Sequence, residues 1–250
     1  MKVRYLTSAL LLAMTSGLAA AASVDIRHEY VPDRDGDEHR DRIYVSHRFD
    51  NQIGYVPDRD GDEHRDRIYV SHRFDNQIGF SVEAKWNYKD GHMGNAGHET
   101  GVSYRWKATD NFSLTPGINI DASPSGASVF KYNLTGAYKI NDEWDVAARI
   151  RHGYKNTDDS RYNQLNLYAN RKFEWGKLGV EAEYKDIHGG EGGWKDKGHD
   201  QLIDFKGEYT KLESGVIPFF AIAAITHKGD GSEFKDEYVP RFRVGLKYNF

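Results

Sequence analysis

Arginine and lysine recur at alternate positions in many segments of this 250-residue chain, and apolar residues separate them. Because successive side chains of an extended strand point to opposite faces, this spacing gathers the cations on one face. Arginine suits carboxylates especially well, because its planar guanidinium binds both carboxylate oxygens at once. The spacing therefore predicts a surface that binds anions. Its cations are Arg27, Arg42, Arg48, Arg67, Arg73, Lys85, Arg105, Lys107, Lys131, Arg149, Arg151, Lys172, Lys185, Lys206, Arg241, Arg243 and Lys247.

Acidic residues at the same alternate positions are fewer, although the formal net charge of the whole chain is −4. They are chiefly Asp25, Glu83, Asp121, Asp145, Glu181, Glu183, Asp204 and Glu208. For any single arginine, pairing with a glutamate that merely fills a small lumen is an equally good interpretation. The excess of cations as a set favours a basic face. Three tyrosines on that face, Tyr44, Tyr69 and Tyr168, offer surfaces for sugar rings.

Signals for catalysis, metal binding and cofactors are weak. The chain has no cysteine, so disulfide and thiolate chemistry is excluded. The glycine-rich segment 188–193 is not followed by the Lys-Ser/Thr pair of a phosphate-binding loop. Segment 33–37 resembles a calcium loop, but Tyr44 stands at its twelfth position, where a glutamate is required. We therefore expect no catalytic residue, no metal ligand and no cofactor.

The elements that must position the cations are strands. The alternation of apolar and polar residues continues almost to the C-terminus, in runs of about 8 to 12 residues, which is the length of membrane-crossing β-strands. Short turns alternate with longer polar segments such as 186–201. Aromatic residues gather at the ends of runs, where the aromatic girdles of a membrane barrel belong. A soluble β-sandwich also explains the alternation, but it would bury the apolar face.

Composition restricts the class of protein further. Hydrophobic residues make up 38% of the chain and the mean hydropathy is −0.75, which excludes a helical multi-span membrane protein. The nearly balanced charge argues against a nucleic-acid partner. The sequence thus predicts an all-β protein, a transmembrane antiparallel β-barrel, located in the outer membrane of a Gram-negative cell.

The first residues have the pattern of a targeting segment. Lys2 and Arg4 precede an apolar stretch, and three alanines at 20–22 offer a cleavage site. We interpret residues 1–22 as a signal peptide and residues 23–250 as a single barrel domain. Phe250 ends the last alternating strand and resembles the C-terminal signal that the barrel-assembly machinery reads.

An identical tandem repeat lies near the start of the barrel domain. Residues 30–54 and 55–79 have the same 25-residue sequence, whereas the rest of the chain does not share this period. One copy contains the end of one strand, an acidic loop, a whole second strand and a turn. Insertion of a copy therefore predicts one additional hairpin and an even number of strands. The alternative is that the additional copy is extruded as a long charged loop.

Several motifs resemble the porins of the KdgM type. They include VDIRHEY at 24–30, DRIYVSHRF at 66–74, GFSVEAKW at 79–86, LTPG at 114–117 and RFRVGLKYNF at 241–250. The resemblance implies a monomeric, twelve-stranded, arginine-lined channel for oligogalacturonates, and a sialic-acid-transporting branch shares this fold. With the repeated hairpin, about fourteen strands are expected, or twelve if the additional copy is looped out.

The function expected from the sequence is passive diffusion of acidic oligosaccharides through an anion-selective lumen, because rings of arginine and lysine are a general device for anion selectivity. Lipopolysaccharide and other outer-membrane lipids are the expected surroundings. A sialic-acid or general anion porin is the first alternative. A non-conducting barrel or a barrel enzyme is the second, and such an enzyme would have to use Asp186, His188, His199 and Asp200.

Overall fold

The computed structural model describes residues 22–31, 38–48, 51–60, 63–89, 92–189, 198–228 and 234–249. Its regular elements are β-strands, and none of the described segments forms a helix that could span a membrane. The strands are β1 (Ala22–Val31), β2 (Glu38–Arg48), β3 (Asn51–Asp60), β4 (Glu63–Arg73), β5 (Ile78–Lys89), β6 (His92–Tyr104), β7 (Trp106–Lys107), β8 (Phe112–Ala122), β9 (Ser128–Lys139), β10 (Trp144–Lys155), β11 (Arg161–Phe173), β12 (Gly176–His188), β13 (Gly198–Tyr209), β14 (Val216–Lys228) and β15 (Phe234–Asn249).

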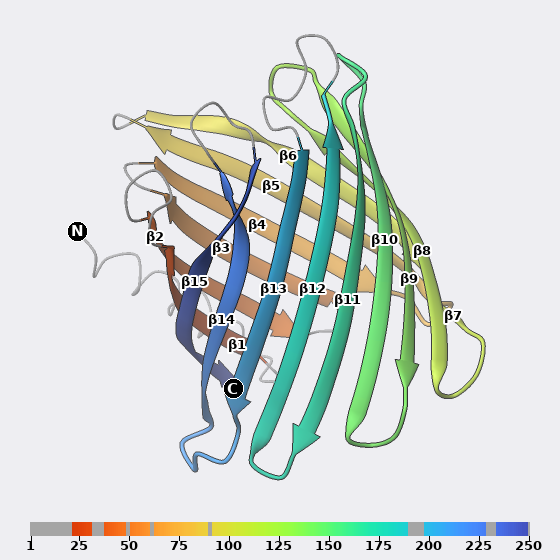
Figure 1. The fold of residues 1–250 in the computed structure, drawn as a ribbon, viewed down its shortest axis with the longest axis vertical. Coiled ribbons are helices and arrows are strands. Elements are labelled where there is room, and N and C mark those ends of the chain that lie inside the picture. Colours follow the sequence, from red (N-terminus) through yellow and green to blue (C-terminus); the bar gives the residue numbers. More distant parts are fainter. Residues whose placement is uncertain are drawn as a thin grey trace.

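All strands belong to one antiparallel sheet that closes into a ring. Consecutive strands pair with each other except β6 and β7, which both pair with β8, and β1 pairs with β15. The two-residue β7 continues the line of β6 along β8, so the described ring has fourteen members. Figure 1 shows β10–β13 running side by side across the near wall, with β2–β6 crossing behind them. The predicted antiparallel barrel is confirmed.

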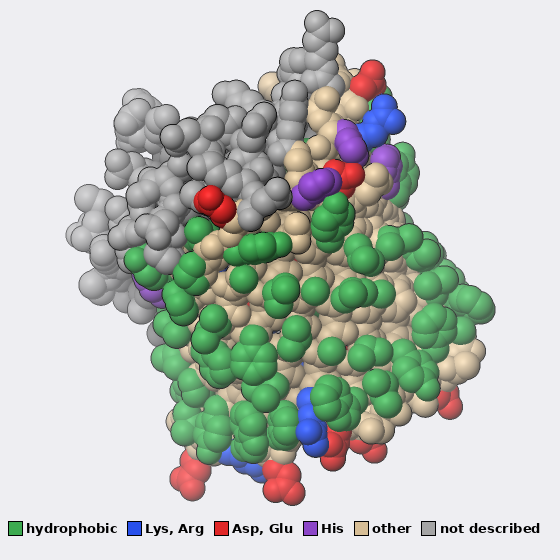
Figure 2. All heavy atoms as spheres, in the orientation of Figure 1, with side chains coloured by type: hydrophobic (Ala, Val, Ile, Leu, Met, Phe, Trp, Pro, Cys, Tyr) green, Lys and Arg blue, Asp and Glu red, His purple; other side chains and the backbone are tan. Residues whose placement is uncertain are grey.

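The apolar half of the alternation faces outward. Val102, Ile150 and Ile203 expose 56%, 56% and 60% of their surface, and Figure 2 shows apolar side chains covering the barrel wall. A soluble protein would bury such residues, whereas a membrane barrel presents them to lipid. The sandwich alternative is therefore wrong, because the exposed face of the sheet is the apolar one.

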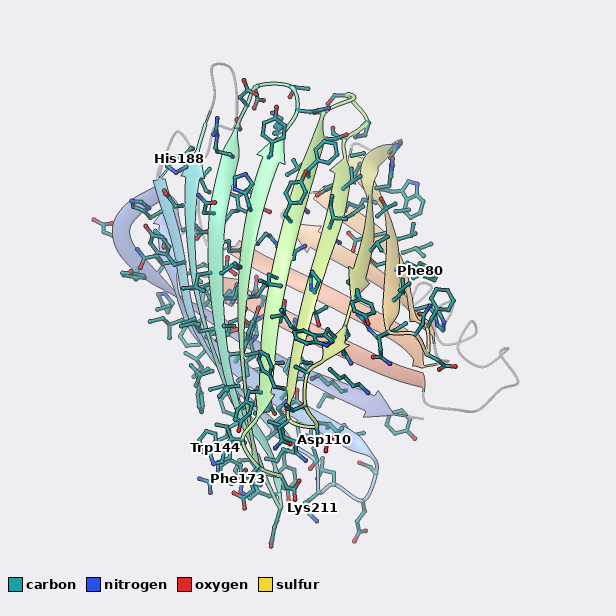
Figure 3. The ribbon with its side chains drawn as sticks, turned by 90° about the vertical axis from the view of Figure 1, so that its right-hand side faces the viewer. Phe80, Asp110, Trp144, Phe173, His188 and Lys211 are labelled. Carbon is teal, nitrogen blue, oxygen red and sulfur yellow. The ribbon has the colours of Figure 1, made fainter. Side chains whose placement is uncertain are left out.

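Aromatic residues lie at one edge of the apolar band. We call this end of the barrel, where short turns connect the strands, the turn end. Figure 3 shows Trp144 and Phe173 at this end and His188 at the opposite end. The Phe173 ring stacks on Trp175 with centroids 5.0 Å apart, and the Arg171 guanidinium lies 4.6 Å from the centroid of Phe173. Rings with a polar neighbour suit the boundary between hydrocarbon and headgroups, so this cluster marks one membrane interface.

Both copies of the repeat enter the sheet. The identical segments Glu38–Arg48 and Glu63–Arg73 form β2 and β4, and β3 pairs with both of them. The looped-out alternative is therefore wrong, and Pro57 lies within β3, where it pairs with Asp66. A proline donates no ladder hydrogen bond, but the strand continues on both sides of it.

The two copies nevertheless pair in different registers. Tyr30 pairs with His39, but its copy Tyr55 pairs with Ile68 rather than with His64. As a result β3 continues to Asp60, which pairs with Glu63, whereas β1 ends at Val31. The offset is an even number of residues, so every side chain keeps its face of the sheet.

Candidate pore lining

The polar half of the alternation faces the inside of the ring, and small residues let long side chains cross it. Lys85 on β5 has Gly97 of β6 as its register partner, and its ammonium reaches Asp121 on β8 at 2.9 Å. Gly97 has φ +107°, and a Cβ there would lie 2.3 Å from the Ala122 carbonyl oxygen. Only glycine fits that backbone, and its missing side chain leaves room for the Lys85 chain.

A lysine–carboxylate cluster covers the inner face of β5, β6, β8 and β9. Register places Glu83 opposite Glu99, and Glu99 opposite Asp121, so three acids lie side by side. The Lys131 ammonium lies 2.7 Å from Glu99 and 2.9 Å from Asp121, and the Lys85 ammonium lies 3.6 Å from Glu83. Adjacent like charges destabilise a sheet unless cations compensate them, and the two lysines supply that compensation. This wall is close to neutral.

A second cluster joins β15, β1 and β13. Arg243 lies opposite Glu29 in the β1–β15 ladder, and the Nε atoms of Arg241 and Arg243 each lie 3.7 Å from a Glu29 oxygen. The Arg243 guanidinium also donates to Asp204 on β13, and Arg241 lies 3.6 Å from the same carboxylate. Both arginines reach β13 over β14, where Ala221 and Ala223 are their small register partners.

Arg149 and Arg151 on β10 have a different environment. Arg149 donates from Nε and Nη2 to Asn166 Oδ1 at 3.3 and 3.1 Å, and Arg151 donates from Nε to Asn133 Oδ1 at 2.5 Å. Among the described residues, no carboxylate lies within 4.0 Å of either guanidinium. Neutral amides orient these two arginines without cancelling their charge.

Several cationic side chains lie over aromatic rings on the inner face. The Arg27 guanidinium and the Lys247 ammonium lie 5.3 and 5.0 Å from the centroid of Phe219. Arg149 lies 5.8 Å from the centroid of Tyr168, and Lys185 lies 4.8 Å from that of Tyr162. Such cation–π contacts orient the charged groups on the inner wall.

The remaining predicted cations are placed as follows. Arg73 donates to the Gln77 carbonyl at 2.6 Å and to Ser103 Oγ at 3.0 Å, near the turn end of the barrel. Arg105 and Lys107 are exposed at the same end. Arg42 lies opposite Arg27 in the ladder, Arg67 lies opposite Lys85, and Arg48 lies opposite Gln52. The side chains of Arg42, Arg48, Arg67, Tyr44 and Tyr69, like the whole of Phe250, lie outside the described residues.

Two groups of lining residues were missing from the sequence-based set. The acids Glu29 and Glu99 share the alternation of their strands, so the same pattern contains a signal for them. The amides Asn133 and Asn166 give no such signal, because an uncharged side chain at an inner position has no distinctive spacing. Asn166 is completely buried and also donates to Glu183 at 2.6 Å. It links the arginine wall to the acids of β12.

Three of the four candidates for a barrel enzyme, Asp186, His188 and His199, lie on the outer face, whereas Asp200 is the register partner of Lys185 on the inner face. Asp186 is 2.8 Å from His188 Nε2 and 3.2 Å from His199 Nδ1, and Tyr184 shares a hydrogen bond with His199 at 2.8 Å. The structure thus joins residues that nothing in the sequence connected. They alternate with lumen-facing neighbours and sit beside the apolar band. No group of three metal-binding side chains occurs among the described residues.

The loop that follows β10 holds a fixed charge at the opposite end from the aromatic cluster. The Lys155 ammonium donates to Asp158, and the Ser160 backbone amide donates to the same side chain at 3.0 Å. These hydrogen bonds lower the pKa of Asp158 to about 2. The carboxylate therefore stays ionised at any physiological pH and is neutralised locally by Lys155.

A closed antiparallel ring with an apolar exterior and a charged interior defines a β-barrel membrane channel. The model of the family described as oligogalacturonate-specific porin protein (KdgM) matches residues 15–60 and 57–250. The chain therefore belongs to the KdgM family and is a porin of the outer membrane. The two matched segments meet within the repeat, as expected if the family pattern lacks the second copy.

Individual relatives agree with this assignment. The chain is 28% identical over 272 residues to the oligogalacturonate-specific porin KdgM of Dickeya dadantii, covering all of both proteins. Among solved structures, a KdgM porin in complex with disordered oligogalacturonate has 24% identity and a TM-score of 0.53, with 91% of this chain and 99% of that chain covered. The NanC porin has 13% identity and a TM-score of 0.58, with 91% and 100% covered. These two structures share the fold.

Proposed function

We propose that this porin conducts acidic oligosaccharides, and oligogalacturonates in particular, by passive diffusion along the arginine-bearing inner wall. The observation that carries this proposal is the environment of Arg149 and Arg151, whose charges the neighbouring amides leave intact. A uronate carboxylate is a bidentate acceptor, which matches the guanidinium fork. Conduction also requires sites that release, and a half-buried arginine already held by an amide has only part of its donor set left for a passing carboxylate.

The names of relatives support the uronide over other acidic sugars. The Dickeya dadantii relative is named for oligogalacturonate specificity, and a KdgM porin was solved with that ligand. A sialic-acid or general anion porin remains the second candidate on the fold shared with NanC. Relatives named as porins also favour a channel over an enzyme.

Planar-bilayer recording tests the proposal. We expect single channels whose reversal potential in a salt gradient indicates anion selectivity, and whose current is interrupted by oligogalacturonate at lower concentrations than by sialic acid. Cation selectivity, or the absence of oligogalacturonate block, contradicts the proposal. A complete lack of conductance supports the non-conducting barrel instead.

The surroundings of the barrel follow from the same proposal. We expect a monomer in outer-membrane lipid and lipopolysaccharide, exported with residues 1–22 as a cleaved signal peptide. Mass determination of the purified protein checks the cleavage, because a mature chain that starts at Ser23 differs in mass from the 28.6-kDa precursor by the leader alone.

Deletion of Phe250 should reduce assembly of the barrel. This residue follows β15, whose outward positions include Leu246 and Tyr248, and it completes the aromatic end that the assembly machinery is expected to read. Surface levels of the truncated chain should fall several-fold relative to full-length protein. Replacement by Tyr, which retains an aromatic terminus, is the matched control, and unchanged levels after deletion contradict the assignment.

A further inference from the structure

Asp204 on β13 is an unusual carboxylate for the inner wall of the barrel. Its side chain is 1% exposed, although it faces the inside of the ring. Its Oδ2 accepts a hydrogen bond from Arg243, and Arg241 Nη2 and Lys206 Nζ lie 3.6 and 3.4 Å from the same oxygen. Three cations from two strands therefore converge on one oxygen atom.

The hydrogen bonding of this group is incomplete. Within the described part of the chain, Asp204 Oδ1 is buried with no hydrogen-bond partner, and so are the Nε atoms of Arg241 and Arg243. Buried polar atoms are satisfied in most proteins, so exceptions call for an explanation. A carboxylate placed only to stabilise the wall would use both of its oxygens.

The arginines, in contrast to Asp204, reach the lumen. The side chains of Arg241 and Arg243 are 18% and 13% exposed, so each is partly accessible to a passing solute. Two other acids lie near the cluster. Glu29 on β1 lies near both arginines, and Glu181 on β12 forms an ion pair with the Lys206 ammonium at 2.6 Å. Together with Asp204, the cluster holds three acids and three cations, so its formal charges balance.

We infer that Asp204 is a resident competitor of the substrate: it occupies Arg241 and Arg243 in place of a uronate carboxylate and so limits how long the substrate stays bound. This inference rests on the proposed function and names the residue that tunes release. A passing carboxylate has to displace Asp204 from the guanidinium groups, which lowers its net affinity there. Weak affinity is what conduction requires, because a pore that binds tightly is blocked by its own substrate.

The geometry of β14 supports this role. Ala223 is the register partner of both Arg241 and Asp204, and Ala221 is that of Arg243. Ala221 and Ala223 are 4% and 3% exposed, and their small side chains lie between the strands that carry the arginines and Asp204. Larger residues at these positions would separate the arginines from Asp204.

The test is single-channel recording of Asp204→Asn with oligogalacturonate in the bath. Asparagine keeps the shape but removes the charge that competes, so the half-blocking concentration should fall and the block duration rise, each by about tenfold, as for the loss of one charge-assisted hydrogen bond. The reversal potential should also shift toward stronger anion selectivity. Glu208→Gln is the matched control, because Glu208 lies on the same strand and contacts Lys247 instead.

A second variant separates competition from net charge. Ala223→Val leaves the number of charges unchanged but places a larger side chain between Arg241 and Asp204. The weakened contact should lengthen the block, as Asp204→Asn does. This variant also keeps the inference testable if the asparagine variant fails to assemble.

Three results overturn the inference: an unchanged block in both variants, a shorter block in either, or an equal effect of Glu208→Gln. Failure of the proposed function is distinguishable. If oligogalacturonate does not block even the unmodified protein, the proposed function is wrong. The reversal potentials of Asp204→Asn and Glu208→Gln in a chloride gradient can then still be compared. A larger shift for Asp204→Asn would show that Asp204 masks the two arginines.

Discussion

A chain that lacks one 25-residue copy should form a narrower channel whose unit conductance is lower by about a quarter. The ring would contain twelve strands instead of fourteen, and barrel diameter grows about linearly with strand number. Deletion of 30–54 and deletion of 55–79 give the same protein, since the two copies are identical. β1 would then pair with the strand that is now β4, with the same sequence of side chains as in its present ladder with β2. The shortened chain should therefore fold, and its conductance is measured in the same bilayers as that of the full chain.

Cysteine cross-linking gives the control for strand number. The chain has no cysteine, so introduced pairs are unambiguous. Val24 is the register partner of Val45, and a Val24→Cys, Val45→Cys pair should form a disulfide in the fourteen-stranded barrel. A Val24→Cys, Val70→Cys pair should form one only if β2 and β3 are excluded from the ring. Efficient linkage of the second pair, or an unchanged conductance after deletion, contradicts the fourteen-stranded barrel.

The fold was largely predictable because a single two-residue alternation of apolar and polar side chains runs along almost the whole chain. Alternation at Ile68, Val70 and Phe80 assigns each residue to a face without knowledge of its neighbours, and the identical segments 38–48 and 63–73 both form strands. The registers were not predictable from the same source. Tyr30 and Tyr55 begin the same 25-residue sequence but pair four residues apart. The residues that precede them in their strands differ, and the register of each hairpin also depends on the strand on its other side.

The lining was predictable as a set of positions but not as a distribution of charge. Alternation places Arg243 on the inner face, but it gives no information on the distance to Asp204, which lies two strands away over β14. Whether a cation is neutralised depends on such contacts between strands that are not neighbours. The small residues that permit them, Ala223 and Gly97, have no chemistry of their own and were not singled out.

Replacement of both Arg149 and Arg151 by Glu should invert the selectivity of the pore. In the described structure each guanidinium is held by an amide, so neither substitution leaves a partner carboxylate unpaired. The inner wall of β10 changes from two positive to two negative charges, next to Glu181 and Glu183 on β12. Substitutions in the lumen alter selectivity more than stability, so the barrel should still assemble.

The measurement is the reversal potential in a potassium chloride gradient, which should change sign. Gln at both positions should give an intermediate value, because it removes the charge without reversing it. Arg161→Glu is the control: Arg161 lies on β11 opposite Tyr154 and His188, on the outer face, and its replacement should leave the potential nearly unchanged. A double variant that stays anion-selective would show that other cations set the selectivity.

Arg149 and Arg151 make a sharper test than Arg241 and Arg243. Glutamates at 241 and 243 would lie beside Glu29 and the buried Asp204, which would then lack their cations. An uncompensated buried carboxylate is strongly destabilising, so loss of anion selectivity there would be mixed with loss of assembly. On β10 the same change of charge has no such consequence in the described structure. A change of sign at 149 and 151 therefore measures the contribution of unmasked arginines to the selectivity of the pore.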